Sequence, residues 1–375
     1  MAEIVTVPGG IQTRSVKGIA LEHGPDSGEE MVRTSVIVIT HNGRHHLDSC
    51  LSSIARQTVR DFETILIDNA SRDGSPEFVR ANFPWVHLIS SETNLGFAAG
   101  NNLAAKSAAG EILVFLNDDT EVDPDWLEKL LAPFRADIRI GVVGSRMVDF
   151  FHRETEILVW CDVLGSAINL GIKRGPPRAG FADVFYVPGF AMAIRRDLFF
   201  EIGGFDESYF MFAEDIDLDW RVLLAGYRMV CAEDSVMYHK FGGSVPGAQI
   251  VVDGPRPFRT SLWKRELGER NLLTTLLKNY GLLSLCWVLP SYLLIFLLEV
   301  AFFIANQRRD IVRAYARALM ANVEKLREIR RFRGRIHGSR RIRDREIIRQ
   351  MHVGSAKLLQ GVKTGFRVEI RNGPR

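Results

Sequence analysis

The stretch EILVFLNDD, residues 111–119, ends a run of apolar residues on one amide and two adjacent carboxylates. The apolar run is typical of a buried strand. Asp118 and Asp119 repel each other unless a cation or hydrogen bonds compensate for their charge. Mg²⁺ or Mn²⁺ would do so, since such hard ions are held by one or two protein carboxylates together with water and substrate phosphate. The alternative is a loop that caps a helix, because the following Asp123-Pro124 pair is a common helix start.

Three other apolar runs lie upstream of this stretch. TSVIVIT (34–40) is continuous and β-branched, as in a strand buried on both faces of a parallel sheet. ETILIDNAS (63–71) and WVHLIS (85–90) are two further strands, and segments with helical spacing separate the runs. This alternation predicts βαβ units, a mostly parallel sheet and an α/β fold.

Polar residues follow three of these strands directly. Thr40 and Asn42 end the first, Asp68 and Asn69 end the second, and residues 117–119 end the fourth. In parallel α/β sheets, ligands bind beyond the carboxyl ends of the strands. We therefore expect these side chains to line one crevice.

The second half of the chain has fewer clear elements. YVPGFAMAIRRDLFFEIGGF (186–205) predicts one strand and one short helix around a Gly-Gly turn. EDIDLDWRVLLAGY (214–227) predicts a helix, with acids in its first turn, an apolar stripe, and Gly226 as its C-terminal cap.

Charge is distributed unevenly along the 375 residues, a length that fits two domains or one large α/β domain with an appendage. Residues 307–375 hold 20 basic and 6 acidic side chains, which leaves a net charge of −11 for residues 1–306. A basic tail indicates an anionic partner, such as a membrane or a nucleic acid.

The four scattered cysteines contain no CxxC pair, which disfavours zinc ribbons and disulfide frameworks. The N-terminus lacks the apolar core of a secretory signal, so we expect the catalytic part in the cytoplasm.

Residues 281–306 are apolar apart from Glu299. The length suffices for a membrane span, but basic clusters lie on both sides, and a single crossing would place one of them on the wrong side. We favour a hairpin of two short helices broken at Pro290, re-entrant or lying on the membrane surface. A full span and a buried helical pair in a soluble domain or dimer interface are the alternatives.

The basic tail beyond this segment has one apolar helical face. Arginines crowd the other face, as in an amphipathic helix at a membrane interface. The alternative is a charged helix packed on the protein body. The apolar face consists of Ile311, Tyr315, Ala318, Leu319, Asn322, Leu326 and Ile329.

Five separated motifs agree in order and spacing with one known family. They are SVIVITHNGRHHLDSCLSSIARQT, ILIDNASRDGS, NLGFAAGNN, FLNDDTEVDPDW and GGFDESYFMFAEDIDLDWRVLLAGY. From about Thr34 to Arg270 the chain resembles the inverting family 2 of nucleotide-sugar glycosyltransferases, and most of all its rhamnosyltransferase-like branch of bacterial surface polysaccharide synthesis. The resemblance implies a GT-A fold, a nucleoside-diphosphate sugar donor and a divalent metal. His41 stands where the family usually has Tyr, which puts base stacking there in doubt.

The resemblance implies donor-binding roles for the polar residues at the strand ends. Thr40 and Asn42 would contact the nucleotide, and Asp68 would accept a hydrogen bond from the base or ribose. The turn that begins at Asn69 would close over the nucleoside. Asp118 would contact the sugar or ribose.

Further donor contacts would come from NLGFAAGNN (94–102) and from the end of the resemblance. Gly96 and Gly100 would permit close backbone approach, while Asn94, Asn101 and Asn102 would add polar reach. A plain loop that leads into a helix is the alternative. Arg270 would meet the diphosphate.

The family's metal motif falls on residues 117–119 and implies that Asp119 holds the cation. His239, in YHKFGGS, matches a position near the diphosphate or metal. The leaving nucleoside diphosphate gains negative charge as the sugar departs, and a cation at Asp119 would neutralise it.

The acidic motif FAEDID implies the catalytic base. Asp215 would take the proton of the acceptor hydroxyl, and Glu214 would position the acceptor or Asp215. One-step displacement predicts inversion at the anomeric carbon. The alternative is that these acids only favour a helix N-terminus, as we expect for Asp217 and Asp219. Asp206 would hold the acceptor or its loop.

Other functions are compatible with parts of the pattern. A retaining enzyme on a related fold is the nearest alternative. A nucleotidyltransferase would need a Gly-rich basic loop after the first strand, which THNGRHHLD lacks. A non-enzymatic membrane scaffold conflicts with the intact acids, and no nucleic-acid-binding motif accompanies the tail.

The predicted organisation has five parts. Residues 1–32 form a loosely ordered lead-in, 33–140 a nucleotide-sugar-binding half, 141–275 an acceptor-binding and catalytic half, 276–306 an apolar hairpin or membrane segment, and 307–375 a basic helical tail. We expect dTDP-rhamnose or a UDP-hexose as donor and a glycan or polyprenyl-diphosphate-linked acceptor. The enzyme would work at the cytoplasmic face of the inner membrane, held by anionic lipids. A second copy of the chain is a further candidate partner.

Overall fold

Four parallel strands form the part of the fold that carries the predicted strand-end residues. They are β3 (Thr34–Thr40), β4 (Glu63–Asn69), β5 (His87–Ser91) and β6 (Ile112–Asn117). In the computed structural model they lie side by side in the order β5-β4-β3-β6, and every pairing is parallel. Three helices connect them: α1 (Arg44–Ala55), α2 (Ser75–Asn82) and α3 (Gly96–Ser107). The predicted βαβ units and parallel sheet are confirmed.

The structure describes residues 4–7, 11–14, 34–176, 178–241, 258–363 and 367–370. Two short strands, β1 (Ile4–Val7) and β2 (Ile11–Arg14), lie within the predicted lead-in and pair antiparallel beside β5. The rest of that lead-in and residues 242–257 lie outside the described residues.

The sheet continues beyond β6 with mixed directions. The strand β12 (Ala191–Arg195) pairs antiparallel with β6 on one side and with β8 (Ile140–Asp149) on the other. The strand β13 (Arg228–His239) runs parallel to β8. Four shorter strands attach to β8, β13 or one another: β7 (Thr120–Val122), β9 (Thr155–Cys161), β10 (Ala167–Lys173) and β11 (Phe181–Asp183).

Helices of the second half agree with the sequence pattern. The strand β12 runs directly into the short helix α5 (Arg196–Glu201), and Gly203 and Gly204 follow with positive φ angles of 90° and 64°. The helix α6 (Glu214–Leu224) ends before Gly226, whose φ is 89°. Two further elements complete this half: α4 (Trp126–Ala136) and the 3₁₀ turn η1 (Glu207–Tyr209).

Both faces of the central sheet are covered, as the continuous apolar strands predicted. On β3, Val36 and Val38 join a buried cluster with Trp126 of α4, while Ile37 joins the cluster on the opposite face. That second cluster includes side chains of α6 and of the C-terminal helices. The parallel strands are therefore buried on both sides, and only their ends are left for chemistry.

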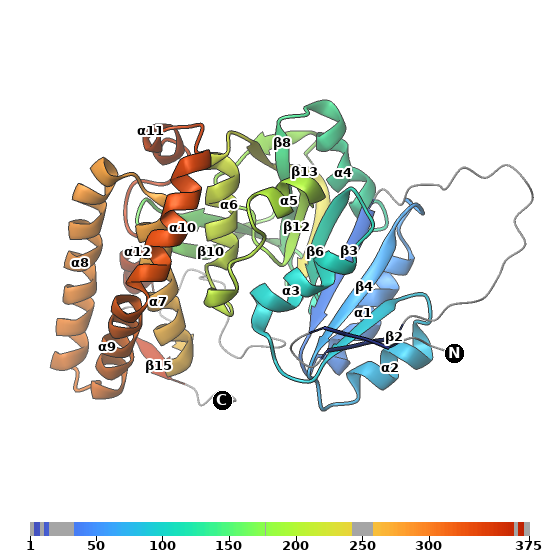
Figure 1. The fold of residues 1–375 in the computed structure, drawn as a ribbon, viewed down its shortest axis with the longest axis horizontal. Coiled ribbons are helices and arrows are strands. Elements are labelled where there is room, and N and C mark those ends of the chain that lie inside the picture. Colours follow the sequence, from blue (N-terminus) through green and yellow to red (C-terminus); the bar gives the residue numbers. More distant parts are fainter. Residues whose placement is uncertain are drawn as a thin grey trace, which may run out of the picture.

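The C-terminal part is helical and packs on one side of the sheet domain (Figure 1). A short parallel pair, β14 (Phe258–Thr260) and β15 (Val368–Ile370), joins its beginning to its end. The helices are α7 (Leu262–Asn279), α8 (Leu282–Ala305), α9 (Arg309–Glu324), α10 (Leu326–Ser339), α11 (Asp344–Ile348) and α12 (Ala356–Lys363).

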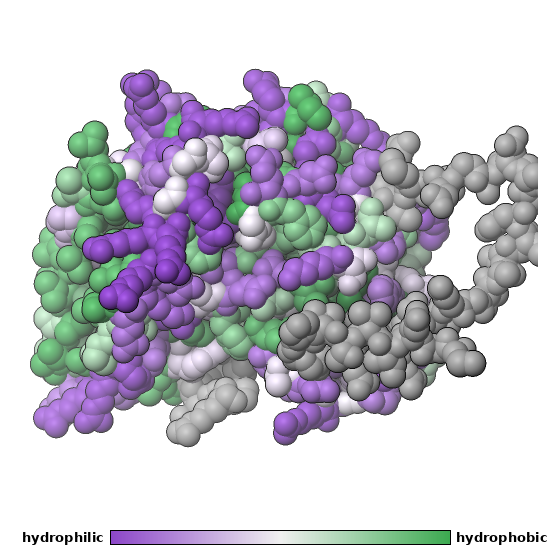
Figure 2. All heavy atoms as spheres, in the orientation of Figure 1, coloured by the Kyte–Doolittle hydropathy of each residue, from purple (hydrophilic) through white to green (hydrophobic). Residues whose placement is uncertain are grey.

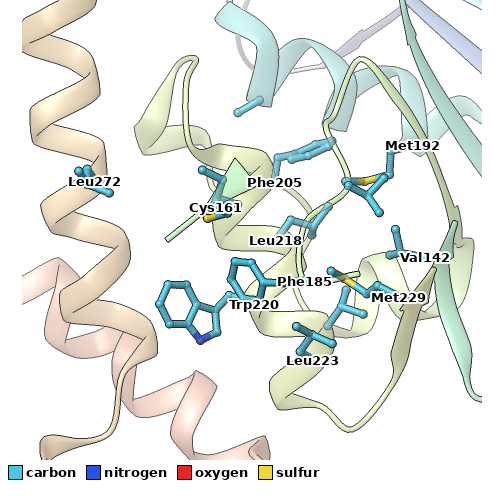
Figure 3. Close-up of a cluster of buried hydrophobic side chains, with 14 of the residues drawn as sticks. Val142, Cys161, Phe185, Met192, Phe205, Leu218, Trp220, Leu223, Met229 and Leu272 are labelled. Atoms are coloured by element: carbon cyan, nitrogen blue, oxygen red, sulfur yellow. The ribbon is translucent and has the colours of Figure 1, made fainter. Parts of the chain in front are cut away.

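The sheet domain and the helical part share one hydrophobic core. Leu272 of α7 belongs to the same buried cluster as Trp220 of α6, and Figure 3 shows the Trp220 indole between the two helices. The Trp220 ring also meets Tyr280 edge-on, with 4.6 Å between ring centroids. The helix α7 also runs without a break through residue 275, where the sequence analysis placed the boundary between two parts of the chain.

The predicted hairpin at Pro290 is wrong, because α8 continues through this residue as one helix. A proline removes one backbone hydrogen bond and crowds the preceding turn, but side chains on both sides of it hold the helix in line. Val288 and Tyr292 are buried, the Tyr292 hydroxyl donates to Glu269 of α7 at 3.2 Å, and Phe296 stacks on Tyr315 of α9. Within the described residues, α8 is the one helix long and apolar enough to cross a membrane.

Most of the apolar face of the tail helices contacts protein, as in the alternative of a helix packed on the body. Ile311, Tyr315, Ala318 and Asn322 of α9 are buried. Asn322 accepts a hydrogen bond from Thr274 of α7 at 2.7 Å. Protein therefore covers most of this face, whereas Leu319 and Leu326 remain exposed at 40% and 37%.

Candidate active site

The carboxyl ends of β3 and β6 meet through a buried hydrogen bond. Thr40 Oγ1 donates to Asp118 Oδ2 at 2.6 Å, and both side chains are buried. Gly43, at the start of α1, lies so close to Asp118 that a Cβ on it would collide with the Asp118 carboxylate and with Thr40. A glycine is required here because the backbone itself approaches the acid. The N-terminus of α1 thus faces Asp118 and favours its negative charge.

Asp119 and His239 form a second close pair. His239 ends β13, and its Nε2 lies 3.1 Å from Asp119 Oδ1. The imidazole stacks on Phe190 and meets Phe241 edge-on, which fixes its orientation. Within the described residues, neither His239 ring nitrogen has a well-aligned hydrogen-bond partner. The sequence prediction placed these two residues together, and the structure does the same.

The Asp119–His239 pair fits a small divalent cation. A carboxylate and an imidazole held 3.1 Å apart, with buried ring nitrogens that lack other partners, present a donor set of the kind that binds Mg²⁺ or Mn²⁺. The described residues contain no cluster of three or more metal-binding side chains. Such ions are commonly held by few protein ligands, with substrate phosphate and water completing the shell.

The loop after β3 and the turn after β4 are tied together at the same edge. Asn42 has φ 57°, its backbone N–H donates to Ser71 Oγ at 2.8 Å, and its side-chain oxygen accepts from Arg72 N–H at 2.8 Å. His41 Nδ1 lies 2.7 Å from the Asn69 carbonyl. The predicted Asn69 turn therefore packs against residues 41 and 42, where it could close over a nucleoside.

Asp68 is buried at the end of β4 and accepts from Ser71 N–H at 3.2 Å. Burial raises the pKa of its carboxyl above the usual range. The neighbouring Asn69 has its amide committed within the protein, since it donates to Gly96 O at 3.0 Å and accepts from Leu95 N–H at 2.8 Å. Asp68 is thus placed to receive a ligand donor, whereas Asn69 holds the adjoining loop.

The NLGFAAGNN motif combines a tight loop with the start of α3. Asn94 accepts from Gly96 N–H at 2.9 Å, and Gly96 has φ 77°. A Cβ on Gly96 would lie 2.5 Å from the Phe210 carbonyl, so this glycine permits an approach by protein backbone. Asn101 is fully buried and donates to Phe97 O, while Asn102 donates to Phe205 O. Contacts within the protein therefore account for most of this motif's polar groups.

Asp215 is oriented by three hydrogen bonds at the start of α6. Its Oδ2 accepts from the Tyr186 hydroxyl at 2.7 Å and from Gly189 N–H at 3.0 Å, and its Oδ1 accepts from Ile216 N–H at 2.9 Å. Desolvation by burial raises the pKa of Asp215. Burial and the Asp215 charge raise the pKa of Glu214 well above its usual range. The pair therefore favours a neutral Glu214 beside a charged Asp215.

Backbone strain is concentrated just before these two acids. Phe210, Phe212 and Ala213 have positive φ angles of 65°, 70° and 64°, a conformation that costs free energy for residues other than glycine. Asn271 of α7 holds this loop by donating to the carbonyls of Tyr209, Met211 and Phe212. The helical part of the chain thus positions the loop that presents Asp215.

Arg270 contributes to the same support. Its guanidinium donates to the carbonyls of Ser208 and Tyr209 at 3.1 and 3.0 Å. The sequence prediction assigned it to the diphosphate, and in the structure it contacts the loop that precedes α6. Its predicted role in donor binding is not tested by these contacts.

Buried ion pairs explain two other acids. Lys278 of α7 lies 2.6 Å from Asp206 and 2.9 Å from Asp217, and Arg221 lies 2.9 Å from Asp217. All four side chains are buried. The neighbouring Lys278 and Arg221 charges hold the pKa of Asp217 down to about 2, although burial opposes this. Asp206 and Asp217 therefore stabilise the packing of α7.

Residues 188–190 join the two predicted catalytic groups. Gly189 N–H donates to Asp215, while the Phe190 carbonyl accepts from Asn117 N–H at 3.1 Å. The Phe190 ring stacks on His239. Asp215 and His239 of the Asp119–His239 pair therefore contact the same three-residue segment, which links the two predicted functional groups.

The sequence prediction missed several residues of this site. The sequence analysis placed Tyr186, Gly189 and Phe190 in a segment with one strand and one helix, and gave them no functional role. The Pro-Gly pair directly before the buried strand β12 was the feature of the sequence that could have indicated a functional turn. His46 was also missed. Burial lowers its pKa to about 4, and it interacts electrostatically with Asp119 and His239. A neutral imidazole therefore lies near the predicted metal ligands.

Comparison with known proteins identifies relatives of part of this chain. Residues 35–203 match the model of the glycosyl transferase family 2. An N-acetylglucosaminyl-diphospho-decaprenol L-rhamnosyltransferase of Mycobacterium tuberculosis is 26% identical over 234 residues, which cover 55% of this chain and 75% of that protein. The O-antigen biosynthesis protein RfbC of Myxococcus xanthus is 28% identical over 221 residues, 55% of this chain and 17% of that protein.

A solved structure shows the same fold at low sequence identity. The chain matches GalNAc-T7, crystallised with UDP, GalNAc and Mn²⁺, with a TM-score of 0.52 and 17% identity, over 66% of this chain and 48% of the other. The protein thus has a GT-A fold with a C-terminal helical extension. It carries a family 2 glycosyltransferase domain and is a glycosyltransferase.

Proposed function

We propose that the protein is an inverting glycosyltransferase that moves a sugar from a nucleoside diphosphate to a hydroxyl group of a lipid-linked or polysaccharide acceptor. The observation that carries the proposal is that residues 188–190 connect the Asp119–His239 pair to Asp215, through the Phe190 ring on His239 and the Gly189 N–H on Asp215. In a single displacement, the leaving diphosphate and the base must lie on opposite faces of the sugar.

Asp119 and His239 would hold Mg²⁺ or Mn²⁺. When bound, such an ion supplies Lewis-acid neutralisation of the charge on the leaving diphosphate. The ion-pair distance of 3.1 Å and the buried imidazole support this assignment. Asp118, held by Thr40 and facing the N-terminus of α1, would contact the sugar or ribose.

Asp215 would remove the proton from the acceptor hydroxyl. Three donors fix the direction of its carboxylate, and a raised pKa makes it a better base than an exposed aspartate. Glu214, which is favoured in its neutral form, would leave Asp215 as the charged member and would help to position the acceptor.

The substrates are proposed from the relatives. The mycobacterial relative is named for transfer of L-rhamnose to a diphospho-decaprenol-linked sugar, which supports dTDP-rhamnose as the first donor to test and UDP-hexoses next. It also supports a polyprenyl-diphosphate-linked acceptor. An enzyme acting on such a lipid would work at the cytoplasmic face of the membrane, where the apolar helix α8 would associate with lipid.

A donor panel tests the proposal. The full chain, with Mn²⁺, is incubated with dTDP-rhamnose, UDP-glucose, UDP-galactose and GDP-mannose, and release of the nucleoside diphosphate is measured with and without a short prenyl-diphosphate-linked acceptor. We expect acceptor-dependent turnover with one donor and an inverted anomeric configuration by NMR. Retention of configuration would exclude Asp215 as the base of a single displacement, and turnover without a divalent ion would exclude the metal.

A further inference from the structure

The outward face of α8 is apolar along the whole helix. Its exposed side chains include Leu283 at 88% exposure, Leu294 at 60%, Leu297 at 61% and Ile304 at 61%. Figure 2 shows this face as a largely hydrophobic strip along the edge of the molecule where Figure 1 draws α8. An apolar strip of this length on a protein surface marks a contact with a membrane or another protein.

The packing of α8 excludes a simple membrane crossing. Its inward side chains contact α7 and α9 along the helix, through Tyr292 to Glu269 and through Phe296 to Tyr315. The opposite side of α9 carries the exposed Arg309, Arg313 and Arg317. These charges would have to enter the hydrocarbon if α8 spanned it, at a large cost in free energy. The geometry therefore suits a helix that lies in the plane of the membrane surface.

A basic cavity adjoins the N-terminal end of this strip. It has a volume of about 730 Å³ and lies between the start of α8, the helix α10 and the segment around α11. Leu282 and Leu283 form its apolar rim and are 73% and 88% exposed. Its basic side chains are Arg330, Arg333, His337, Arg340, Arg343 and Arg345, and Asp344 is the one acid among its lining residues.

Three of these arginines are available to a ligand. Arg333 is committed to backbone carbonyls at the end of α7, and Arg340 forms an ion pair of 2.6 Å with Asp344. The side chains of Arg330, Arg343 and Arg345 are exposed and make no hydrogen bond or ion pair within the described residues. Since Asp344 is already paired, the cavity has a strong excess of positive charge.

We propose that this cavity binds the phosphate headgroups of anionic membrane lipids while the exposed face of α8 lies among their acyl chains. Guanidinium groups match phosphate in charge and geometry. The adjoining Leu282 and Leu283 would follow the acyl chains of the same lipid, so one molecule would contact both surfaces. The inference rests on the proposed membrane association and is independent of the donor sugar and of the acceptor.

The test compares two triple variants of the full chain that have the same net charge. In the cavity variant, Arg330, Arg343 and Arg345 are each replaced by Gln; in the control, the exposed Arg56, Arg60 and Arg135 of the sheet domain are replaced by Gln. Co-sedimentation is measured with vesicles of phosphatidylcholine alone and of phosphatidylcholine mixed with phosphatidylglycerol.

The wild-type chain should bind the anionic vesicles preferentially. The cavity variant should lose roughly 100-fold in affinity for them, since each arginine near an anionic surface contributes about a factor of five. The control variant should change by less than about threefold, because its arginines lie outside the membrane contact. A second variant, Leu283→Ser with Leu297→Ser, should weaken binding even at high salt; both side chains are exposed, so folding should be preserved.

Three outcomes would overturn the proposal. Equal losses in the cavity and control variants would show general electrostatic attraction without a site. Binding of inorganic phosphate to the cavity by a chain that does not bind vesicles would show a site for a soluble anion. A dimer that dissociates in the Leu283→Ser, Leu297→Ser variant, without vesicle binding, would show that a second copy covers α8. Release of the nucleoside diphosphate in solution separates this proposal from the proposed function, because the cavity variant should keep that activity.

Discussion

The sheet edge and the C-terminal helices use charged residues in opposite ways. At the edge, Asp118, Asp119 and Asp215 are drawn into the protein and oriented by hydrogen bonds or by a neighbouring imidazole. In the helical part, most arginines point outward and only Lys278 and a few others are buried in ion pairs. Function that depends on bond-making needs fixed groups, whereas attraction to a surface needs only charge density.

This difference leads to separate expectations for the two regions. Substitutions at the sheet edge should lower activity. They should leave the free energy of unfolding nearly unchanged, because crowded or strained acids do not stabilise the fold and their removal therefore costs little. Substitutions of buried groups in the helices should lower stability first. The predictions below test this division, beginning with the largest expected effect.

Replacing the proposed base should have the largest effect. Asp215→Asn keeps the shape of the side chain but cannot take the proton from the hydroxyl of the acceptor substrate. The kcat should therefore fall by roughly two to four orders of magnitude. Donor binding, measured by calorimetry, should be retained. The exposed Asp48→Asn is the matched control. Normal turnover by Asp215→Asn would assign the base elsewhere.

Removing the proposed metal ligand should come next. Asp119→Ala should lower turnover by about two to three orders of magnitude, because charge on the leaving diphosphate is no longer stabilised. Unlike Asp215→Asn, it should also weaken Mn²⁺ binding, measured directly by electron paramagnetic resonance in the presence of UDP. Unchanged Mn²⁺ affinity would contradict the assignment.

A buried cation in the helical part should affect stability. Lys278→Met removes the positive charge that Asp206 and Asp217 share, so both buried carboxylates keep less countercharge. Breaking a buried pair in this way costs about 3–5 kcal/mol. Chemical denaturation should show the loss, and Lys106→Met on the surface of α3 should not. Equal stability of the two variants would mean that the ion cluster does not support the fold.

The proline in α8 offers a smaller effect of opposite sign. Pro290→Ala restores a backbone donor inside a continuous helix and should stabilise the protein by up to about 3 kcal/mol. Thermal unfolding measures the change. A loss of stability would indicate that the packing of α8 depends on the helix geometry that Pro290 imposes.

The smallest predicted effect is a shift in the pH dependence of activity. The hydrogen bond from Tyr186 lowers the pKa of Asp215, whereas burial raises it. Tyr186→Phe should therefore raise the pKa further, and because the base must be ionised, the acid limb of the rate–pH profile should move to higher pH. At high pH the variant should recover most of its activity. An unshifted limb would show that another group controls it.

Elements with a strong local pattern were predictable from the sequence. The continuous runs at β3, β4 and β6 indicated buried parallel strands, and their polar ends were expected at one edge. The acids and Gly226 marked α6 in the same way. These features depend on short-range periodicity and capping, which a single sequence displays directly.

Features that depend on contacts between distant segments were not predictable. The continuity of α8 through Pro290 follows from its packing on Glu269 and Tyr315, which local propensity does not reveal. The contacts of Tyr186 and Gly189 with Asp215 join residues that are 29 and 26 positions apart. The contacts of Arg270 with the carbonyls of Ser208 and Tyr209 likewise join α7 to a loop 62 and 61 positions away.

The sequence by itself determined where the strands end and which acids follow them, because continuous apolar runs and turn chemistry are local properties of the chain. Only the tertiary structure decided which of those acids meet. Residues 188–190 contact both Asp215 and His239, and α7 and α9 turn one face of α8 inward, because packing selects among the faces and partners that local pattern leaves open.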